Sequence, residues 1–317
     1  MPPANTIRVG TAGWSYEDWK SIVYPLRPPR GFDRLGMMAS LFDTNEINSP
    51  FYRIPTARQT ADWSRRVAHN PRFVFTAKLY RGFTHEREAG SAEEKEYLGA
   101  LEPLQRDGRL GCVLAQFPMS FHHTTENRGF LTRLLQRFAS VAIAVEFRHE
   151  SWDTEDTRQL LEERDAAFVN IDQPRLRGNL RPTTHVTSPI AYFRFHGRNA
   201  EKWFGPDTSN EERYNYLYSE SELAPWAERI RGAAERTARL PSKAPTRAGV
   251  FAILNNHFRG QAVTNALQLQ QMLTGEIREI PETLRDAYPA LAAAGHPSPG
   301  PPQMPLFGVS ARIRPKS

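Results

Sequence analysis

An apolar run ends in a cluster of charge at residues 145–152, VEFRHESW. The preceding stretch 141–145, VAIAV, is typical of a buried strand, and four ionisable side chains follow it, Glu146, Arg148, His149 and Glu150. A carboxylate beside a guanidinium and an imidazole can transfer protons, bind an anion or form an ion pair. Charge at the end of a buried strand therefore indicates a functional site or a buried ion pair at that position.

Similar polar side chains follow other predicted strands. Short apolar runs rich in strand-forming residues occur at 7–13, 45–51, 73–79, 110–117, 141–147, 166–172, 190–196 and 249–256. Their nearly continuous apolar character predicts strands that are buried on both faces, as in a parallel sheet. The polar residues at or just after the ends of these strands are Glu46, Asn48, Lys78, Gln116, Glu146, Arg148, Asp172, Arg194, His196, Asn255 and Asn256.

The elements that must position these residues alternate along the chain. Segments with helical spacing separate most of the strands, at residues 57–67, 91–104, 126–138, 153–165 and 261–275. Asp153 is expected to cap the fourth of these helices, and Gly275 is expected to end the last one. Eight strands alternating with helices predict an α/β protein with a single TIM-type (β/α)8 barrel over residues 1–290. No GxGxxG or GxxxxGK[ST] motif follows a strand, which excludes the usual nucleotide-binding motifs.

Two segments depart from this alternation. A long insertion, residues 198–248, lies between the seventh and eighth strands. Its second half opens with the capping box Ser219 to Glu222 and is expected to be a helix. Its first half contains Trp203 and is expected to form a loop over the barrel mouth. The tail, residues 291–317, is rich in proline and glycine, and we expect it to be disordered.

The composition limits the possible partners and compartments. The net charge of +6 favours anionic partners such as nucleic acid and phosphorylated metabolites. The single cysteine, Cys112, excludes a disulfide framework and argues against a cysteine-based metal site. Neither a membrane-spanning apolar stretch nor a signal peptide is evident, so we expect a cytoplasmic protein.

Strand periodicity brings the polar residues together. Side chains two positions apart share a face, as for Glu46 with Asn48 and for Arg194 with His196. In (β/α)8 enzymes the chemistry is built at the carboxyl ends of the strands, so we expect one polar cluster at the barrel mouth. A structural alternative remains, a network without catalytic function in which charged residues pair with one another. Its members would be Glu46, Lys78, Glu146, Arg148 and Arg194.

The sequence resembles the DUF72, or YecE-like, family. The matching motifs are GTAGWSYEDWKSIVYP (10–25), FDTNEINSPFYRIP (42–55), FVFTAKLYRGFTHER (73–87), LGCVLAQFP (110–118), VAIAVEFRHESW (141–152), YFRFHGRN (192–199) and ILNNHFRGQAVTNALQL (253–269). The resemblance implies a (β/α)8 barrel whose biochemical function is uncharacterised. The family's motif residues fall on Trp14, Glu46, Asn48, Tyr52, Lys78, His85, Gln116, Glu146, Arg148, His149, Trp152, Arg194, His196, Gly197, Asn255 and Asn256.

Acid–base chemistry on an anion is the chemistry we expect of the cluster. Glu146 or Glu46 would be the general base, with Lys78 or His196 as acid or charge stabiliser. The catalytic candidates are therefore Glu46, Lys78, Glu146, Arg148 and His196. Barrel enzymes often bind phosphate with the loops after strands 7 and 8, which here carry Arg198 and Arg259. The substrate-binding candidates are Trp14, Asn48, Tyr52, His85, Gln116, His149, Trp152, Asp172, Arg194, Arg198, Trp203, Asn255, Asn256 and Arg259.

A cofactor is not expected, although a divalent metal remains an alternative. Carboxylates and histidines from several strands are how barrel enzymes bind such ions. Here the acids are matched by lysine and arginine, whereas a multinuclear site needs an excess of negative charge.

The tail carries a separate motif, QMPLF at residues 303–307. It matches the Gln-x-x-Leu-Phe pattern of peptides by which bacterial DNA-processing proteins bind the replication sliding clamp. The residues that would bind this partner are Gln303, Leu306 and Phe307. A flexible tail with an exposed Leu-Phe pair suits a hydrophobic groove. In the alternative interpretation, Phe307 folds back on the barrel.

Together these features predict an enzyme that acts on an anionic, phosphate-containing substrate and is linked to DNA processing through its tail. A non-catalytic module that binds nucleic acid or a metabolite is one alternative. A sugar-phosphate isomerase or lyase is another.

Overall fold

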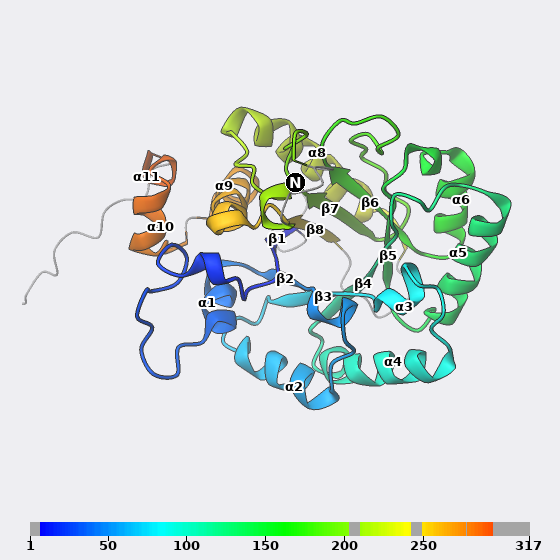
Figure 1. Cartoon of the computed structure of the whole chain (residues 1–317), viewed down its shortest axis with the longest axis horizontal. Helices are drawn as coiled ribbons and strands as arrows, with labels where there is room; N and C mark the ends of the chain where they lie inside the picture. The colour runs from blue at the N-terminus through cyan, green and yellow to red at the C-terminus, as the bar shows by residue number, and fades with distance from the viewer. Residues whose placement is uncertain (1–6, 203–209, 242–248, 277, 294–317) are drawn as a thin grey trace, which may run out of the picture.

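Eight parallel strands close into a barrel in chain order, and the last strand pairs with the first (Figure 1). The computed structural model describes residues 7–202, 210–241, 249–276 and 278–293. The strands are β1 Ile7–Ala12, β2 Thr44–Ile47, β3 Val74–Lys78, β4 Leu110–Gln116, β5 Ile143–Glu146, β6 Ala167–Asp172, β7 Ile190–Phe195 and β8 Gly249–Leu254. The predicted (β/α)8 barrel is confirmed, with each strand close to its expected position.

Helices surround the strands (Figure 1). They are α1 Arg34–Leu41, α2 Ala57–Arg66, α3 Arg81–Thr84, α4 Ser91–Arg106, α5 Thr125–Arg137, α6 Glu155–Glu163, α7 Asn210–Arg213, α8 Glu220–Thr237, α9 Gln261–Thr274, α10 Glu282–Ala287 and α11 Ala290–Ala293. Short 3-10 turns are η2 Glu17–Trp19, η3 Ser49–Phe51, η4 Glu150–Trp152 and η5 Phe258–Gly260. None of the helices in the described ranges is long and apolar enough to span a membrane.

Local sequence signals set most of the helix ends. The predicted capping box at the start of α8 is present, because Ser219 and Glu222 exchange side-chain and backbone contacts. Gly275 ends α9 in the left-handed conformation, as expected. The N-cap prediction for Asp153 is wrong. Helix α6 begins two residues later, so Thr154 is the cap and its hydroxyl accepts from the amide of Thr157.

The barrel interior is filled by side chains from opposite strands. A Cβ added to Gly111 on β4 would lie 2.5 Å from the ring of Phe251 on β8, so glycine leaves the space that this ring occupies. The hydroxyl of Tyr192 on β7 lies 2.8 Å from that of Thr76 on β3. Cys112 on β4 is also buried. The interior at these levels is therefore packed with side chains.

The insertion between β7 and β8 is confirmed, and it folds back over the strands. Its helix α8 packs on both β7 and β8. Residues 214–218, which precede α8, return the chain toward the barrel, where the amide of Gly197 donates to the hydroxyl of Tyr218 at 3.0 Å. Trp203, expected in the loop over the mouth, lies outside the described residues, as do all residues beyond 293.

Candidate active site at the barrel mouth

A buried ion-pair network forms the top of the packed interior. Arg194 at the end of β7 donates from Nε and Nη2 to Glu46 on β2, at 2.9 and 2.6 Å. Its Nη1 donates to Glu146 on β5 at 2.7 Å. Glu146 also lies 2.7 Å from Nε of Arg148, and Glu46 accepts from the hydroxyl of Tyr192 at 2.8 Å. Both carboxylates are therefore paired with guanidinium groups, and Oε1 of Glu146 accepts no hydrogen bond from a described residue.

The electrostatics of this network fix the protonation states of its members. Burial alone would raise the pKa of Glu146, but the charges of Arg148 and Arg194 outweigh burial and hold the pKa well below its ordinary value of 4.5. Burial and the charge of Arg148 lower the pKa of His196 to about 3. The amide nitrogen of Asn255 lies 3.0 Å from Nδ1 of His196. Since that amide nitrogen donates, the neutral imidazole carries its proton on Nε2, which faces Glu146 at 3.4 Å.

A cavity of about 310 Å³ lies above the network. The residues that line it are Tyr16, Asn48, Tyr52, Lys78, Arg148, Arg194, Tyr214, Asn255 and His257. Tyr16 and His257 stack with ring centroids 4.4 Å apart, and Tyr214 lies 5.0 Å from His257. Tyr52 is 70% exposed and lies at the rim. The cavity thus combines a charged floor with aromatic walls.

Lys78 places an amine with a lowered pKa at this cavity. Its Nζ lies 4.0 Å from the centroid of the Phe51 ring and makes no hydrogen bond or ion pair with any residue that the structure describes. Burial, followed by the nearby charge of Arg194, lowers the pKa of Lys78 to about 7. Near neutral pH the amine is therefore divided between its charged and neutral forms.

Arg148 provides a second donor at the cavity, in addition to the Lys78 amine. Its Nη1 donates to Gln173 at 3.1 Å and its Nε faces Glu146, whereas Nη2 donates to none of the described residues. The same guanidinium borders a smaller hollow of about 160 Å³, which Gln116 and Tyr214 also line. Arg148 and Tyr214 thus separate two adjoining spaces at the barrel mouth.

The arginines expected to bind phosphate lie elsewhere. Arg198 pairs with Asp172 at 2.6 Å and with Glu222 at 3.0 Å. Asp172 also accepts from Nε1 of Trp226 on α8 at 2.7 Å, so this cluster attaches the insertion to the barrel. Arg259 is exposed, and its backbone amide donates to Asp18 at 2.6 Å. Neither arginine lines the cavity.

The described part of the chain holds no cluster of metal ligands. Among the residues that the structure describes, no group of three or more His, Cys, Asp or Glu is placed to hold a metal ion. The carboxylates of Glu46 and Glu146 are both paired with the guanidinium of Arg194.

Comparison with known proteins agrees with the sequence motifs. The family model described as "Protein of unknown function DUF72" matches residues 8–289. The chain belongs to the DUF72 family. This confirms the resemblance seen in the sequence.

Two solved DUF72 proteins and one curated protein match this chain over nearly their whole length. The DUF72 family protein TM1631 of Thermotoga maritima is 35% identical, with a TM-score of 0.72, and the match covers 84% of this chain and 99% of that one. The DUF72 protein EF0366 of Enterococcus faecalis is 27% identical, with a TM-score of 0.72, over 87% and 98% of the two chains. The UPF0759 protein YunF of Bacillus subtilis is 27% identical over 84% of this chain and 94% of its own length.

The structure brings together only part of the predicted DUF72 site. Six predicted residues line the cavity, namely Asn48, Tyr52, Lys78, Arg148, Arg194 and Asn255. Glu46, Glu146 and His196 lie beneath it in the network, and Gln116 lines the adjoining hollow. His85 lies behind Phe51, with ring centroids 4.9 Å apart. The remaining described candidates lie away from the cavity, namely Trp14, His149, Trp152, Asp172, Arg198, Asn256 and Arg259.

Several of these outlying DUF72 motif residues have visible structural contacts. Trp152 is buried and donates from Nε1 to the carbonyl of Phe121 at 2.6 Å. His149 stacks on His122 at 3.9 Å. Asn256 donates to the carbonyl of Tyr216 at 2.8 Å and so holds the insertion.

Three cavity residues, Tyr16, Tyr214 and His257, were not among the predicted site residues. Tyr16 lies in the motif GTAGWSYEDWKSIVYP, two positions after the predicted Trp14. His257 follows Asn255 by two positions, so extending the strand alternation past the end of β8 would have found it. Tyr214 comes from the insertion, where no periodic pattern exists to indicate its direction.

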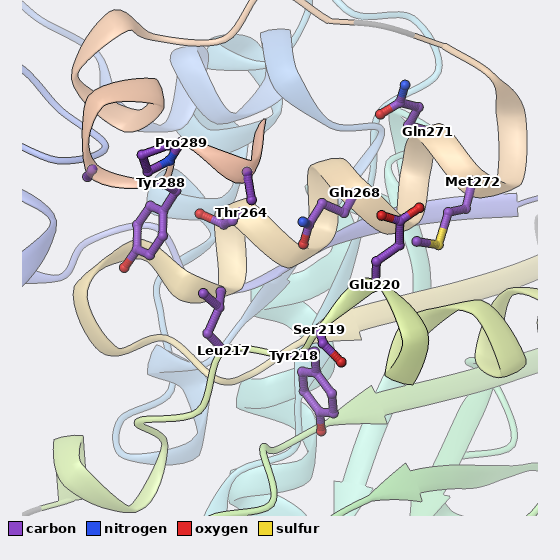
Figure 2. Close-up of a pocket in the computed structure, with 12 residues that line it drawn as sticks. Leu217, Tyr218, Ser219, Glu220, Thr264, Gln268, Gln271, Met272, Tyr288 and Pro289 are labelled. Atoms are coloured by element: carbon purple, nitrogen blue, oxygen red, sulfur yellow. The ribbon is translucent and has the colours of Figure 1, made fainter. Parts of the chain in front are cut away.

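A larger hollow lies on the outside of the barrel of this DUF72 protein (Figure 2). It has a volume of about 1,040 Å³ and lies between the start of α8, helix α9 and the segment 287–290. Leu217, Gln268, Met272 and Tyr288 are among the residues that line it. It contains no predicted site residue and no lysine, arginine or histidine, so we place the chemistry in the smaller cavity at the mouth.

Proposed function

We propose that this chain is an enzyme that acts on a small anionic substrate bearing a phosphate group, bound in the cavity at the barrel mouth. The observation that carries the proposal is a pair of cations at that cavity. Arg148 and Lys78 line the same cavity, and neither Nη2 of Arg148 nor Nζ of Lys78 donates a hydrogen bond to a described residue. Guanidinium and ammonium groups are the side chains that bind phosphate oxygens.

The charge balance at the mouth favours an anion. Glu46 and Glu146 are matched by Arg194 and Arg148, so a protonated Lys78 is the charge left over. A bound phosphate supplies its missing partner. Because the pKa of Lys78 is about 7, about half of the amines are charged near neutral pH and can pair with the phosphate, and the rest are neutral.

The size of the cavity favours a small metabolite. A volume of about 310 Å³ lies at the lower end of the range of about 300–1,000 Å³ for small-molecule sites. The rings of Tyr16, Tyr214 and His257 offer flat surfaces against which a sugar or a base can pack. These features support a sugar-phosphate isomerase or lyase more than an enzyme that binds a long nucleic acid.

We assign the proton transfer to Lys78 and a positioning role to Glu146. A general acid or base works best when its pKa lies near the working pH, and the pKa of about 7 at Lys78 meets this condition. The pKa of Glu146 is held well below 4.5, which makes this carboxylate a weak base. Its contacts with Arg194 and Arg148 support the other role, the orientation of the guanidinium groups.

Phosphate titration calorimetry tests the binding part of the proposal. Arg148→Met and Lys78→Met each remove one charged donor, and a hydrogen bond to a charged group contributes about 1.5–3 kcal/mol. We therefore expect each variant to bind inorganic phosphate about 10- to 150-fold more weakly. Arg259→Met is the matched control, since Arg259 is exposed and outside the cavity. Unchanged affinity in both cavity variants contradicts the proposal.

Turnover distinguishes an enzyme from a binding module. Wild type and Lys78→Met are compared on a panel of phosphorylated sugars, with substrate depletion followed by chromatography. An enzyme converts at least one substrate, and Lys78→Met binds that substrate without converting it. A binding module shows affinity changes only.

We also propose that the tail binds the replication sliding clamp. The support is the sequence pattern alone, because Gln303, Leu306 and Phe307 lie outside the described residues. A peptide of residues 300–317 is titrated against the clamp, with Leu306→Ala and Phe307→Ala together as control. Absence of binding at about 100 μM, equivalent to about −5.5 kcal/mol, removes this part of the proposal.

A further inference from the structure

The two cations that line the cavity come from different strands and suit different parts of a substrate. Arg148 follows β5 and Lys78 ends β3, and both border one cavity. A guanidinium is always charged and cannot act as a nucleophile, so it can hold a phosphate at any pH. A neutral lysine amine has a lone pair that can attack an electrophilic carbon.

The surroundings of Lys78 keep its amine available for this reaction. No carboxylate among the described residues pairs with Nζ, because Glu46 and Glu146 both face Arg194. The buried ion pairs fix the charge of Arg194 near the amine, and that charge disfavours protonation of Lys78. Phe51 closes one side of the amine with an apolar ring at 4.0 Å. Desolvation and a neighbouring cation are the two conditions that activate lysines for attack on carbonyl substrates.

We propose that Lys78 forms a Schiff base with the carbonyl carbon of the substrate, which makes that substrate a small phosphorylated aldehyde or ketone. This inference rests on the proposed function, because Arg148 must hold the phosphate while Lys78 reaches the carbonyl. It narrows the substrate from any phosphate-bearing molecule to one with a free carbonyl group.

The chemistry of this step balances without a further reactant. The lone pair of Nζ attacks the carbonyl carbon, and the π electrons of the C=O bond move to the oxygen. The resulting carbinolamine loses its oxygen as water together with the two hydrogens that Nζ carried, and a C=N bond remains. Protonation of that nitrogen gives an iminium ion, which withdraws electrons from the bonds of the neighbouring carbon.

Reductive trapping tests the inference on the full-length chain. The protein is incubated at pH 7 with glyceraldehyde 3-phosphate or dihydroxyacetone phosphate and sodium cyanoborohydride, and adducts are located by peptide mass spectrometry. At pH 7 an ordinary lysine with a pKa of about 10.4 has about one amine in 2,500 neutral. Because the pKa of Lys78 is about 7, about half of its amines are neutral. We therefore expect Lys78 to be labelled at least about 100-fold faster than the exposed Lys95 on α4.

Two variants and one competitor give the matched controls. Lys78→Arg keeps the positive charge but has no nucleophilic amine, so the adduct disappears, whereas Lys95→Arg leaves labelling at Lys78 unchanged. Inorganic phosphate competes at Arg148 and slows the labelling. Mapping of the wild-type adduct gives an answer even if Lys78→Arg folds poorly.

The outcomes separate this inference from the proposed function. Labelling of Lys78 no faster than that of Lys95 overturns the Schiff base. The absence of any adduct, when titration shows phosphate bound through Arg148, also overturns the Schiff base but leaves the proposed function standing. Failure of both phosphate binding and labelling removes both.

Discussion

Replacing Glu146 with Gln tests whether the buried carboxylate holds the two guanidinium groups in place. Its oxygens lie 2.7 Å from Nη1 of Arg194 and 2.7 Å from Nε of Arg148. Glutamine keeps the shape and removes the charge, and its amide nitrogen must then face one of two guanidinium donors. Breaking a buried ion pair costs about 3–5 kcal/mol. We expect the free energy of unfolding to fall by about that amount.

Thermal and urea unfolding measure this loss. Each kcal/mol lowers Tm by about 2–4 °C in a domain of 150–250 residues, so we expect a decrease of roughly 6–20 °C. Glu102→Gln is the matched control. Glu102 lies exposed on α4, 3.9 Å from Arg106, and its loss should change stability by less than about 0.5 kcal/mol.

The pH dependence of the unfolding free energy provides a second test of the role of Glu146. The pKa of Glu146 is lower in the folded protein than its ordinary value of 4.5, so its stabilising contribution is complete above that value. The contribution is lost as the pH falls through the folded-state pKa. The difference in unfolding free energy between wild type and Glu146→Gln should therefore be largest above pH 4.5 and shrink in more acidic solution. A Tm within about 2 °C of wild type at pH 7 would refute the account of the network.

Further predictions concern Lys78, Gly197 and Asn255. The rate at which an acylating reagent modifies Lys78 should rise with increasing pH, with a midpoint near pH 7. A midpoint near pH 10 would contradict this. Lys78 keeps its proton up to about pH 10.5 in the unfolded chain but loses it near pH 7 in the folded one. The free energy of unfolding of wild type, relative to that of Lys78→Met, should therefore increase between pH 7 and pH 10.5. Gly197 has a φ of +84°, and an added Cβ would lie 2.7 Å from Tyr216, so Gly197→Ala should cost about 1–3 kcal/mol in urea unfolding. Gly99→Ala, in the middle of α4 with no atom within 4 Å of its Cβ, should stabilise the protein by about 0.5–1 kcal/mol. Asn255→Ala removes the donor at Nδ1 of His196, and nitrogen NMR should show the proton of the imidazole redistributed between its two nitrogens.

The barrel was predictable because its strands are buried on both faces. Continuous apolar runs such as 110–117 are typical of strands that are buried on both faces of a parallel sheet. Their alternation with helices predicts the (β/α)8 fold. Periodicity also placed Glu46 and Arg194 correctly, since both end their strands facing inward. Four of the five residues in the network alternative form ion pairs with one another, and Lys78 does not.

The partners of individual charges were not predictable. Sequence shows that Arg148 and Arg198 both lie near strand ends, but their partners depend on how the loops close. Arg198 pairs with Asp172 on β6 and with Glu222 on α8, whereas Nη2 of Arg148 donates to none of the described residues. The carboxylate of Asp18 accepts a hydrogen bond from the backbone amide of Arg259, which lies 241 residues later in the chain. Closure of the barrel brings these two residues together. The chemistry of the mouth thus depends on contacts between residues far apart in the chain.

The crystal structure of the chain soaked with inorganic phosphate tests the central claim most directly. The account predicts a phosphate in the cavity at the mouth, with oxygens about 2.7–3.2 Å from Nη2 of Arg148 and Nζ of Lys78. A cavity without phosphate at saturating concentration, or phosphate bound at Arg198 and Arg259 instead, would contradict it.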